Sequence, residues 1–292
     1  MTPVDPAETR KGLAAALACF AMWGVFGLYF KLLAALPAPE VLAHRILGGA
    51  LFAFLLLALR GGLAEVRQVL VDWRRLRLLT ASALCIAVNW GLFIWAVANG
   101  RALESSMGYF IFPLMSVLLG RLVFNERLGR RQGAAVAVVA AGVGWMILRG
   151  HGVPWLALML AVSFAGYGLL RKLVPVSALG GLLIEALLLA PAALLYLVVT
   201  GGGEVPRAGV ATQAVIALAG PVTAVPLVLF AVAARRLKMS TIGLLMYLNP
   251  TLQMLVAVFA FGEPFTAVHA VVFAAIWVGL ALYSWPGRAS PH

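Results

Sequence analysis

Residues 98–108 read A-N-G-R-A-L-E-S-S-M-G, and residues 233–243 read A-A-R-R-L-K-M-S-T-I-G. When the two stretches are aligned, Arg101 falls on Arg236 and Gly108 falls on Gly243. Two more markers follow in the same order in both places, an aromatic-x-x-Pro segment and then Phe-x-Glu. A chance likeness between apolar segments would not be expected to keep this order, so the pattern predicts an internal duplication of the chain.

The chain is too apolar for a soluble domain of its length. Of its 292 residues, 63% are hydrophobic and 11% are charged, and the mean hydropathy is +1.02. Soluble domains carry about 25% charged residues because their outer shell faces water. The composition therefore predicts an all-α membrane protein, since a helix satisfies its own backbone hydrogen bonds in lipid.

Apolar segments of about 17 to 25 residues, enough to cross a bilayer, recur along the whole chain. The first of them is too long for the apolar core of a signal peptide, so we expect it to be retained. We predict ten transmembrane helices, at Gly12 to Ala34, Pro39 to Leu59, Leu78 to Ala98, Ala102 to Val123, Gln132 to Leu148, Val153 to Leu170, Ala178 to Val199, Ala211 to Ala234, Met239 to Phe261 and Phe265 to Trp285.

Each copy of the duplicated unit holds five of these spans, and an odd number turns the second copy upside down in the membrane. We therefore expect two inverted five-helix repeats, over residues 12–148 and 149–285, between short tails at 1–11 and 286–292. Inverted repeats are typical of secondary transporters, because the pseudo-twofold axis supplies two interconvertible gates around one central site.

The 22 Lys and Arg residues are unevenly divided between the two sides of the predicted membrane. If the N-terminus is cytoplasmic, the outer side holds Lys31, Arg101, Arg149 and Arg207, Arg45 lies inside a span, and all the others are cytoplasmic. This bias follows the positive-inside rule and predicts that both termini are cytoplasmic. The basic residues are spread over separate loops, which excludes a nucleic-acid-binding surface despite the net charge of +12.

Three titratable side chains lie inside predicted spans, where polar groups usually face a wet cavity. His44 and Arg45 lie about 8 Å below the outer end of the second span, and Glu185 lies about 10 Å from the inner end of the seventh. If Lys31 is matched with Arg171, at a shift of 140 residues, Arg45 and Glu185 become equivalent positions in the two predicted copies. We predict that the three residues bind a charged part of a substrate or carry a coupling proton. A structural polar cluster, or snorkelling of Arg45 to the membrane edge, is the open alternative.

Further polar and aromatic residues inside the spans would suit a pocket for an aromatic or amphipathic ligand. Pro113 and Pro250 are predicted to kink equivalent spans, either to shape such a pocket or simply for packing. The remaining candidates for substrate binding or coupling are Trp23, Lys31, Asn89, Trp90, Tyr109, Tyr167, Tyr247 and Asn249.

The sequence contains no ATP-binding P-loop and no metal-ligand spacing, so we expect neither cofactor nor metal. An intramembrane enzyme that uses His44 and Glu185 on a lipid-like substrate is a second hypothesis. The opposite depths of these two residues, and the lack of a recognisable nucleophile, count against it. A non-transporting membrane scaffold is a third hypothesis.

Several stretches resemble the EamA family of the drug/metabolite transporter superfamily, and in particular its RarD group. That group usually carries an asparagine before the proline of the fourth span, where this chain has Phe112, while the second copy keeps Asn249. The matching stretches are F-A-M-W-G-V-F-G-L-Y-F-K (20–31), E-V-L-A-H-R (40–45), N-W-G-L-F-I-W-A-V (89–97), E-S-S-M-G-Y-F-I-F-P-L (104–114) and G-L-L-I-E (181–185).

The resemblance implies ten helices around a central cavity in a bacterial inner membrane. It also implies export of amino acids, related metabolites or amphiphilic drugs by alternating access, in which case the partners are a small-molecule substrate and the lipid bilayer. The resemblance does not fix the substrate, the coupling ion or the oligomeric state.

Overall fold

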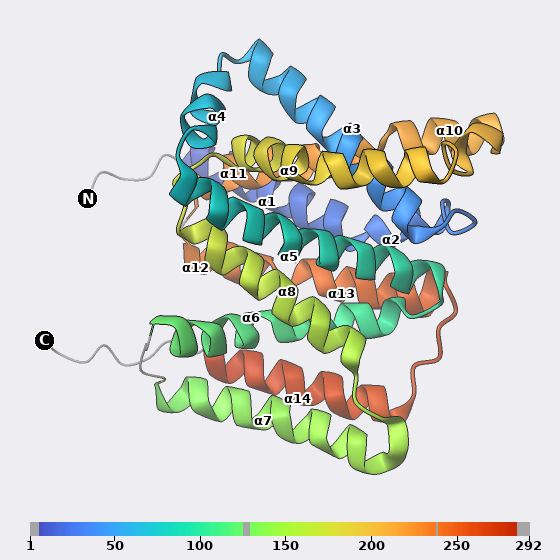
Figure 1. The fold of residues 1–292 in the computed structure, drawn as a ribbon. Coiled ribbons are helices and arrows are strands. Elements are labelled where there is room, and N and C mark those ends of the chain that lie inside the picture. Colours follow the sequence, from blue (N-terminus) through green and yellow to red (C-terminus); the bar gives the residue numbers. More distant parts are fainter. Residues whose placement is uncertain (1–5, 125–128, 238, 285–292) are drawn as a thin grey trace, which may run out of the picture.

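The computed structural model describes residues 6–124, 129–237 and 239–284, and every regular element within these ranges is a helix. The outer parts of the two predicted tails and the first-copy marker residues Asn125 and Glu126 lie outside the described residues. Figure 1 shows long helices that run side by side, and α1 begins at the same end of the bundle at which α14 ends. We call this the terminal end.

The helices follow the predicted spans closely, and α9 has the predicted bounds. In the first half they are α1 Pro6–Gly24, α2 Phe26–Lys31, α3 Ala38–Leu59, α4 Leu63–Leu70, α5 Trp73–Ala98, α6 Ala102–Phe124, α7 Arg130–Met146 and the π-helical turn Ile147–His151. In the second half they are α8 Trp155–Lys172, α9 Ala178–Val199, the 3₁₀ turn Val205–Arg207, α10 Val210–Ala217, α11 Ala219–Ala234, α12 Met239–Leu245, α13 Leu248–Leu255, the π-helical turn Val256–Ala260 and α14 Ala267–Ser284.

Within the described residues, eight segments are long and apolar enough to cross a membrane, and a shorter apolar helix covers Ala267–Leu282. The protein is therefore an all-helical, multi-pass membrane protein. The eight segments are Ala7–Lys31, Ala38–Leu59, Trp73–Ala98, Ala102–Val123, Gln132–Arg149, Ala178–Val199, Val210–Ala234 and Thr241–Ala260.

Two helices begin more than a turn before their predicted first residues. α1 begins at Pro6 rather than Gly12, so part of the expected N-terminal tail is helical. α5 begins at Trp73 rather than Leu78, because Asp72 caps it by accepting hydrogen bonds from the backbone N–H groups of Arg74 and Arg75. The apolar span thus covers only part of a helix whose first turn is charged.

Prolines explain two of the breaks within predicted spans. Pro250 has no N–H to offer the Met246 carbonyl, and the helix is interrupted between α12 and α13. Pro221 likewise cannot donate to the carbonyl of Ala217, where α10 ends. Pro113, by contrast, lies inside the continuous α6, so the two equivalent prolines differ in their effect on the backbone.

The short helix α4 lies between α3 and α5. Val66 and Val69 are buried in a cluster with Leu79 of α5 and Leu179 of α9. Protein therefore covers these two side chains, whereas Ala64, Arg67, Gln68 and Leu70 are exposed.

The helices pack in a regular pattern that brings the two halves of the chain together. α3 packs on α9, α6 on α13 and α7 on α14; α1 contacts α11 and α13, and α8 contacts α5 and α6. Some crossings are very close: a Cβ added to Gly108 of α6 would lie 2.7 Å from the carbonyl oxygen of Ala157 in α8. At Gly24 of α1 an added Cβ would lie 2.5 Å from the Cβ of Leu252 in α13. At these two positions only glycine allows so close an approach.

Candidate substrate cavity

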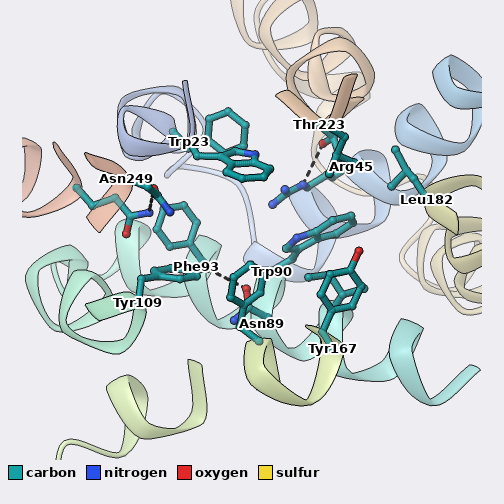
Figure 2. A pocket seen from close by; sticks show the side chains of 15 residues that line it. Trp23, Arg45, Asn89, Trp90, Phe93, Tyr109, Tyr167, Leu182, Thr223 and Asn249 are labelled. Atoms are coloured by element: carbon teal, nitrogen blue, oxygen red, sulfur yellow. Dashed lines mark hydrogen bonds between the residues drawn. The ribbon is translucent and has the colours of Figure 1, made fainter. Parts of the chain in front are cut away.

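A cavity of about 720 Å³, its open side included, lies between helices from both halves of the chain. Figure 2 shows the lining side chains converging on a common space. The lining residues are Trp23, Phe26, Arg45, Ile86, Asn89, Trp90, Phe93, Tyr109, Phe164, Tyr167, Leu182, Thr223, Leu227, Asn249 and Gln253.

Arg45 is the charged residue among the described residues that line this cavity. Its side chain is held by a hydrogen bond and by aromatic rings, which include Phe26 and Phe30 at 5.9 and 5.3 Å. Its Nε donates a 3.1 Å hydrogen bond to Thr223 Oγ1 on α11, and its guanidinium carbon lies 4.0 Å from the centre of the Trp90 ring. The residue is only 6% exposed. These contacts fix the orientation of the guanidinium without neutralising its charge.

Asn89 organises the opposite wall by joining three helices. The Tyr109 hydroxyl on α6 donates a 2.8 Å hydrogen bond to Asn89 Oδ1. Asn89 Nδ2 on α5 donates to the Leu160 carbonyl and to Ser163 Oγ on α8, at 3.0 and 3.2 Å. A buried amide whose donor and acceptor sides are both used holds its neighbours in fixed positions. The phenol and the amide therefore have their positions set before any ligand enters.

Aromatic rings make the rest of this wall flat and apolar. The Tyr109 ring lies edge-on to Phe93 and Phe164, with centroids 5.9 and 5.6 Å apart. Phe164 stacks on Tyr167 at 6.0 Å with an interplanar angle of 16°. Such edges and faces favour planar ligands.

Asn249 and Gln253 supply the amide groups of α13. Gln253 Nε2 donates a 2.8 Å hydrogen bond to Asn249 Oδ1, one turn earlier on the same helix. Asn249 also lines a smaller neighbouring cavity of about 350 Å³, together with Tyr247. Pro113 and Pro250 both line this smaller cavity, so the two equivalent prolines face one space.

Glu185 does not line the large cavity. It is 2% exposed and accepts a 2.6 Å hydrogen bond from Ser82 Oγ on α5. Arg171 Nε lies 3.8 Å from the same carboxylate oxygen, and Arg171 also donates to the carbonyl of Ser177, the residue that caps α9. The carboxylate is thus engaged by groups from α5 and α8. Tyr167, which lines the cavity, interacts electrostatically with both Glu185 and Arg171.

His44 and Lys31 lie apart from the cavity. His44 is half-buried and interacts electrostatically with Glu40. Glu40 itself accepts hydrogen bonds from the backbone N–H groups of Glu204 and Val205, both at 2.7 Å. Lys31 is exposed, and its Nζ lies 5.4 Å from the centre of the Phe261 ring.

The structure therefore brings together most of the predicted binding residues but not the predicted charged cluster. Arg45 lines the cavity, whereas His44 and Glu185 do not. The predicted residues that do line it are Trp23, Arg45, Asn89, Trp90, Tyr109, Tyr167 and Asn249.

Sequence reasoning missed Thr223 and assigned Arg171 to a cytoplasmic loop. A threonine in an apolar run is the signal that could have drawn attention to Thr223, but only the packing of α11 on α3 brings it to Arg45. For Arg171, the sequence feature that could have drawn attention to it is Gly181. A Cβ there would collide with the Arg171 guanidinium, so the glycine leaves room for the side chain to fold back over α9.

Several known proteins are similar to this chain in sequence. The EamA-like transporter family profile matches residues 10–148. An uncharacterized transporter of Pseudomonas aeruginosa is 43% identical over 285 residues, which cover 96% of this chain and 95% of the relative. Protein RarD of Salmonella typhi is 40% identical over 283 residues, which cover 96% of each chain.

A solved crystal structure has a similar fold. It matches with a TM-score of 0.61 at 21% sequence identity, and the match covers 95% of both chains. At this identity the likeness concerns the arrangement of the helices.

Proposed function

Because this chain belongs to the EamA-like transporter family, we propose that it is a secondary transporter that exports a small metabolite or an amphiphilic drug by alternating access. Family membership places it among transporters rather than enzymes. The observation that carries the proposal is the cavity, which both halves of the chain line and into which one buried cation projects. Sites of this kind, between two repeats, are where secondary transporters bind their substrates.

The symmetry of the helix contacts supports two inverted five-helix repeats. In this reading α1/α2 corresponds to α8, α3 to α9, α5 to α10/α11, α6 to α12/α13, and α7 to α14. When each helix is replaced by its counterpart in the other half, the α1–α11 contact becomes α8–α5 and the α1–α13 contact becomes α8–α6. Both of these contacts are present. The pairs α3–α9, α6–α13 and α7–α14 map onto themselves. With α8 and α14 counted as spans, the chain has ten.

We place the terminal end in the cytoplasm, on the basis of the Lys and Arg distribution. Contacts between the two halves then occur on both sides of the membrane. At the cytoplasmic end, Arg236 Nε lies 2.8 Å from the carboxylate of Glu8. At the outer end, the Glu263 carboxylate accepts hydrogen bonds from the first N–H groups of α6, at Ala102 and Leu103, both at 2.7 Å.

Alternating access requires each of these contacts to open in turn while the other closes. The Glu8–Arg236 pair joins α1 to the turn after α11, so we assign it to the inner gate. The Glu263 contacts join the loop before α14 to α6, so we assign them to the outer gate. The cavity between the gates is the substrate site in this proposal.

Counterflow in proteoliposomes tests the function. Vesicles containing the full chain are preloaded with unlabelled compound, and uptake of labelled amino acids or drugs is measured with and without a pH gradient. Saturable exchange that is absent from protein-free vesicles is the expected result. The proposal fails if folded protein exchanges none of the compounds, or if it converts one of them into a product.

A proton is the coupling ion to be tested, and Glu185 is the residue at which to test it. Its carboxylate interacts electrostatically with Tyr167, which lines the cavity. Glu185→Gln keeps the shape of the side chain but cannot release a proton. If this variant transports with an unchanged response to the pH gradient, Glu185 does not carry the coupling proton.

A further inference from the structure

The positive charge of Arg45 has no counter-charge in the described part of the chain. No Asp or Glu side chain there forms an ion pair with it. Glu40, on the same helix, is turned to the backbone of Glu204 and Val205. Glu185 is engaged by Ser82 and Arg171. A buried cation without an anion is costly unless something else supplies the negative charge.

The guanidinium is also oriented to receive an anion. Its Nε is used by Thr223, and its guanidinium carbon lies near the rings of Trp90, Phe30 and Phe26. Neither terminal nitrogen of Arg45 donates a hydrogen bond to a described residue. Neither of them is among the fully buried atoms without a partner, so both keep some exposed surface. Figure 2 shows the guanidinium pointing towards the space between Trp23 and Trp90. Two parallel N–H groups of an arginine match the two oxygens of a carboxylate.

The surroundings of Arg45 fit the remainder of such a ligand. The cavity wall is largely aromatic, with Trp90 beside the cation and Trp23, Tyr109 and Phe164 facing the same space. A planar ring attached to a carboxylate could lie against these side chains while its acid group meets Arg45.

The same cavity offers little to an ammonium group. Its lining contains no Asp or Glu among the described residues, and its polar groups other than Arg45 are amides, hydroxyls and the indole N–H groups. The Asn89 carbonyl oxygen is already used by Tyr109, and that of Asn249 by Gln253. Gln253 Oε1 has no hydrogen-bond partner in the described part of the chain, but it is a neutral acceptor and supplies no negative charge. A zwitterion or a cation would therefore lose its hydration without gaining an anionic partner.

We propose that the cavity selects monoanionic aromatic solutes, with Arg45 binding the carboxylate and the aromatic wall binding the ring, over zwitterionic, cationic and neutral compounds with the same ring. The inference deepens the proposed function, on which it rests for transport, but it makes a separate claim about binding.

A matched series on one ring tests the selectivity: indole-3-acetate, tryptophan, tryptamine and indole. Binding of each compound to the purified full chain in detergent is measured by calorimetry. We expect indole-3-acetate to bind at least about tenfold more tightly than the other three. Equal or tighter binding of tryptophan, tryptamine or indole overturns the proposal.

Variants test the role of Arg45. Arg45→Met removes the charge and is expected to reduce the affinity for indole-3-acetate by about tenfold or more. Arg45→Lys keeps the charge but loses the two-pronged geometry, and intermediate affinity is expected. Arg77→Met is the matched control, because Arg77 is an exposed arginine outside the cavity; its affinity should equal that of the wild type. If Arg45→Met does not fold, Arg45→Lys and Arg77→Met decide, and equal affinity in both overturns the proposal.

Counterflow with the same compounds separates this inference from the proposed function. Binding of indole-3-acetate that depends on Arg45, without exchange of any compound, supports the ligand class and contradicts transport. Exchange of tryptophan that is insensitive to Arg45→Met supports transport and overturns the ligand class. Exchange of indole-3-acetate that is lost in Arg45→Met supports both.

Discussion

Arg45 and Glu185 are both buried charges, on the contacting helices α3 and α9, yet their surroundings differ. Glu185 has a hydroxyl donor in Ser82 and a cation in Arg171. Arg45 has a neutral acceptor, an aromatic face and an open cavity. The sequence alignment of the two predicted copies pairs these two positions. We propose that they do different work, Glu185 within the protein and Arg45 towards a ligand.

The largest expected effect comes from removing the charge that faces the cavity. Arg45→Met should reduce counterflow of an anionic substrate by about 100-fold, since a charge-assisted bidentate contact is lost. The melting temperature should stay the same or rise, because the variant no longer buries a cation without an anion. Counterflow rates and thermal unfolding in detergent check the two effects. If Arg45→Met transports at close to the wild-type rate, Arg45 does not serve the ligand, and the proposed difference between Arg45 and Glu185 is wrong.

Removing the charge of Glu185 should lower the stability of the protein more than its ligand binding, which is the opposite of what we expect for Arg45→Met. Glu185→Ala leaves Ser82 and Arg171 without their shared acceptor, and we expect a loss of about 1–3 kcal/mol in unfolding free energy. Binding of the anionic ligand should change much less than in Arg45→Met. Glu185→Gln, which can still accept from Ser82, should be the less destabilised of the two. Denaturation in mixed micelles with a ligand titration measures both quantities. A stable Glu185→Ala that fails to bind would reverse the comparison.

A glycine substitution perturbs the same ion pair from its other side. In Gly181→Ala the new methyl group would occupy the place of the Arg171 guanidinium, so Arg171 should be displaced from Glu185, at a cost of about 1–2 kcal/mol. Gly168→Ala is the matched control on α8, where an added Cβ meets nothing within 4 Å. The melting temperatures of the two variants should differ, with Gly168→Ala close to the wild type. Equal values would mean that the Arg171 position contributes little.

The smallest effect should come from the neutral partner of Arg45. Thr223→Val removes the acceptor of Arg45 Nε while keeping the shape of the side chain, and we expect about fivefold weaker binding of the anion. Thr251→Val is the control, since Thr251 bonds the Tyr247 carbonyl within its own helix. If both valine variants bind equally well, the position of Arg45 does not depend on Thr223.

Much of the fold could be predicted because the backbone N–H and C=O groups of every span must be hydrogen-bonded within the protein when they lie in lipid. α9 has the predicted bounds, and the interruption before Pro250 is where a missing N–H places it. The early start of α5 could not be read from hydropathy. It depends on the Asp72 cap and on arginines that extend the helix beyond its apolar part.

The site was predictable in part, for a related reason. Aromatic and amide residues inside spans indicate an interior, so Asn89, Trp90 and Tyr109 could be found from their positions in the sequence. The separation of His44 and Glu185 from Arg45 could not, since depth along a helix does not say which neighbour each side chain meets. Thr223 shows the same limit. Its contact with Arg45 arises from the crossing of two helices that are distant in sequence.

The glycine crossings limit how the bundle can deform. Gly108 allows α6 to approach α8, and Gly24 allows α1 to approach α13, without a side chain between the backbones. Surfaces in such close contact leave no room for one helix to slide along its neighbour. We therefore expect each of the two helix pairs to move as a rigid body, with the displacement confined to the boundary between the pairs. Spin-label distances within each pair should stay constant, while those across the boundary lengthen on one side of the membrane and shorten on the other.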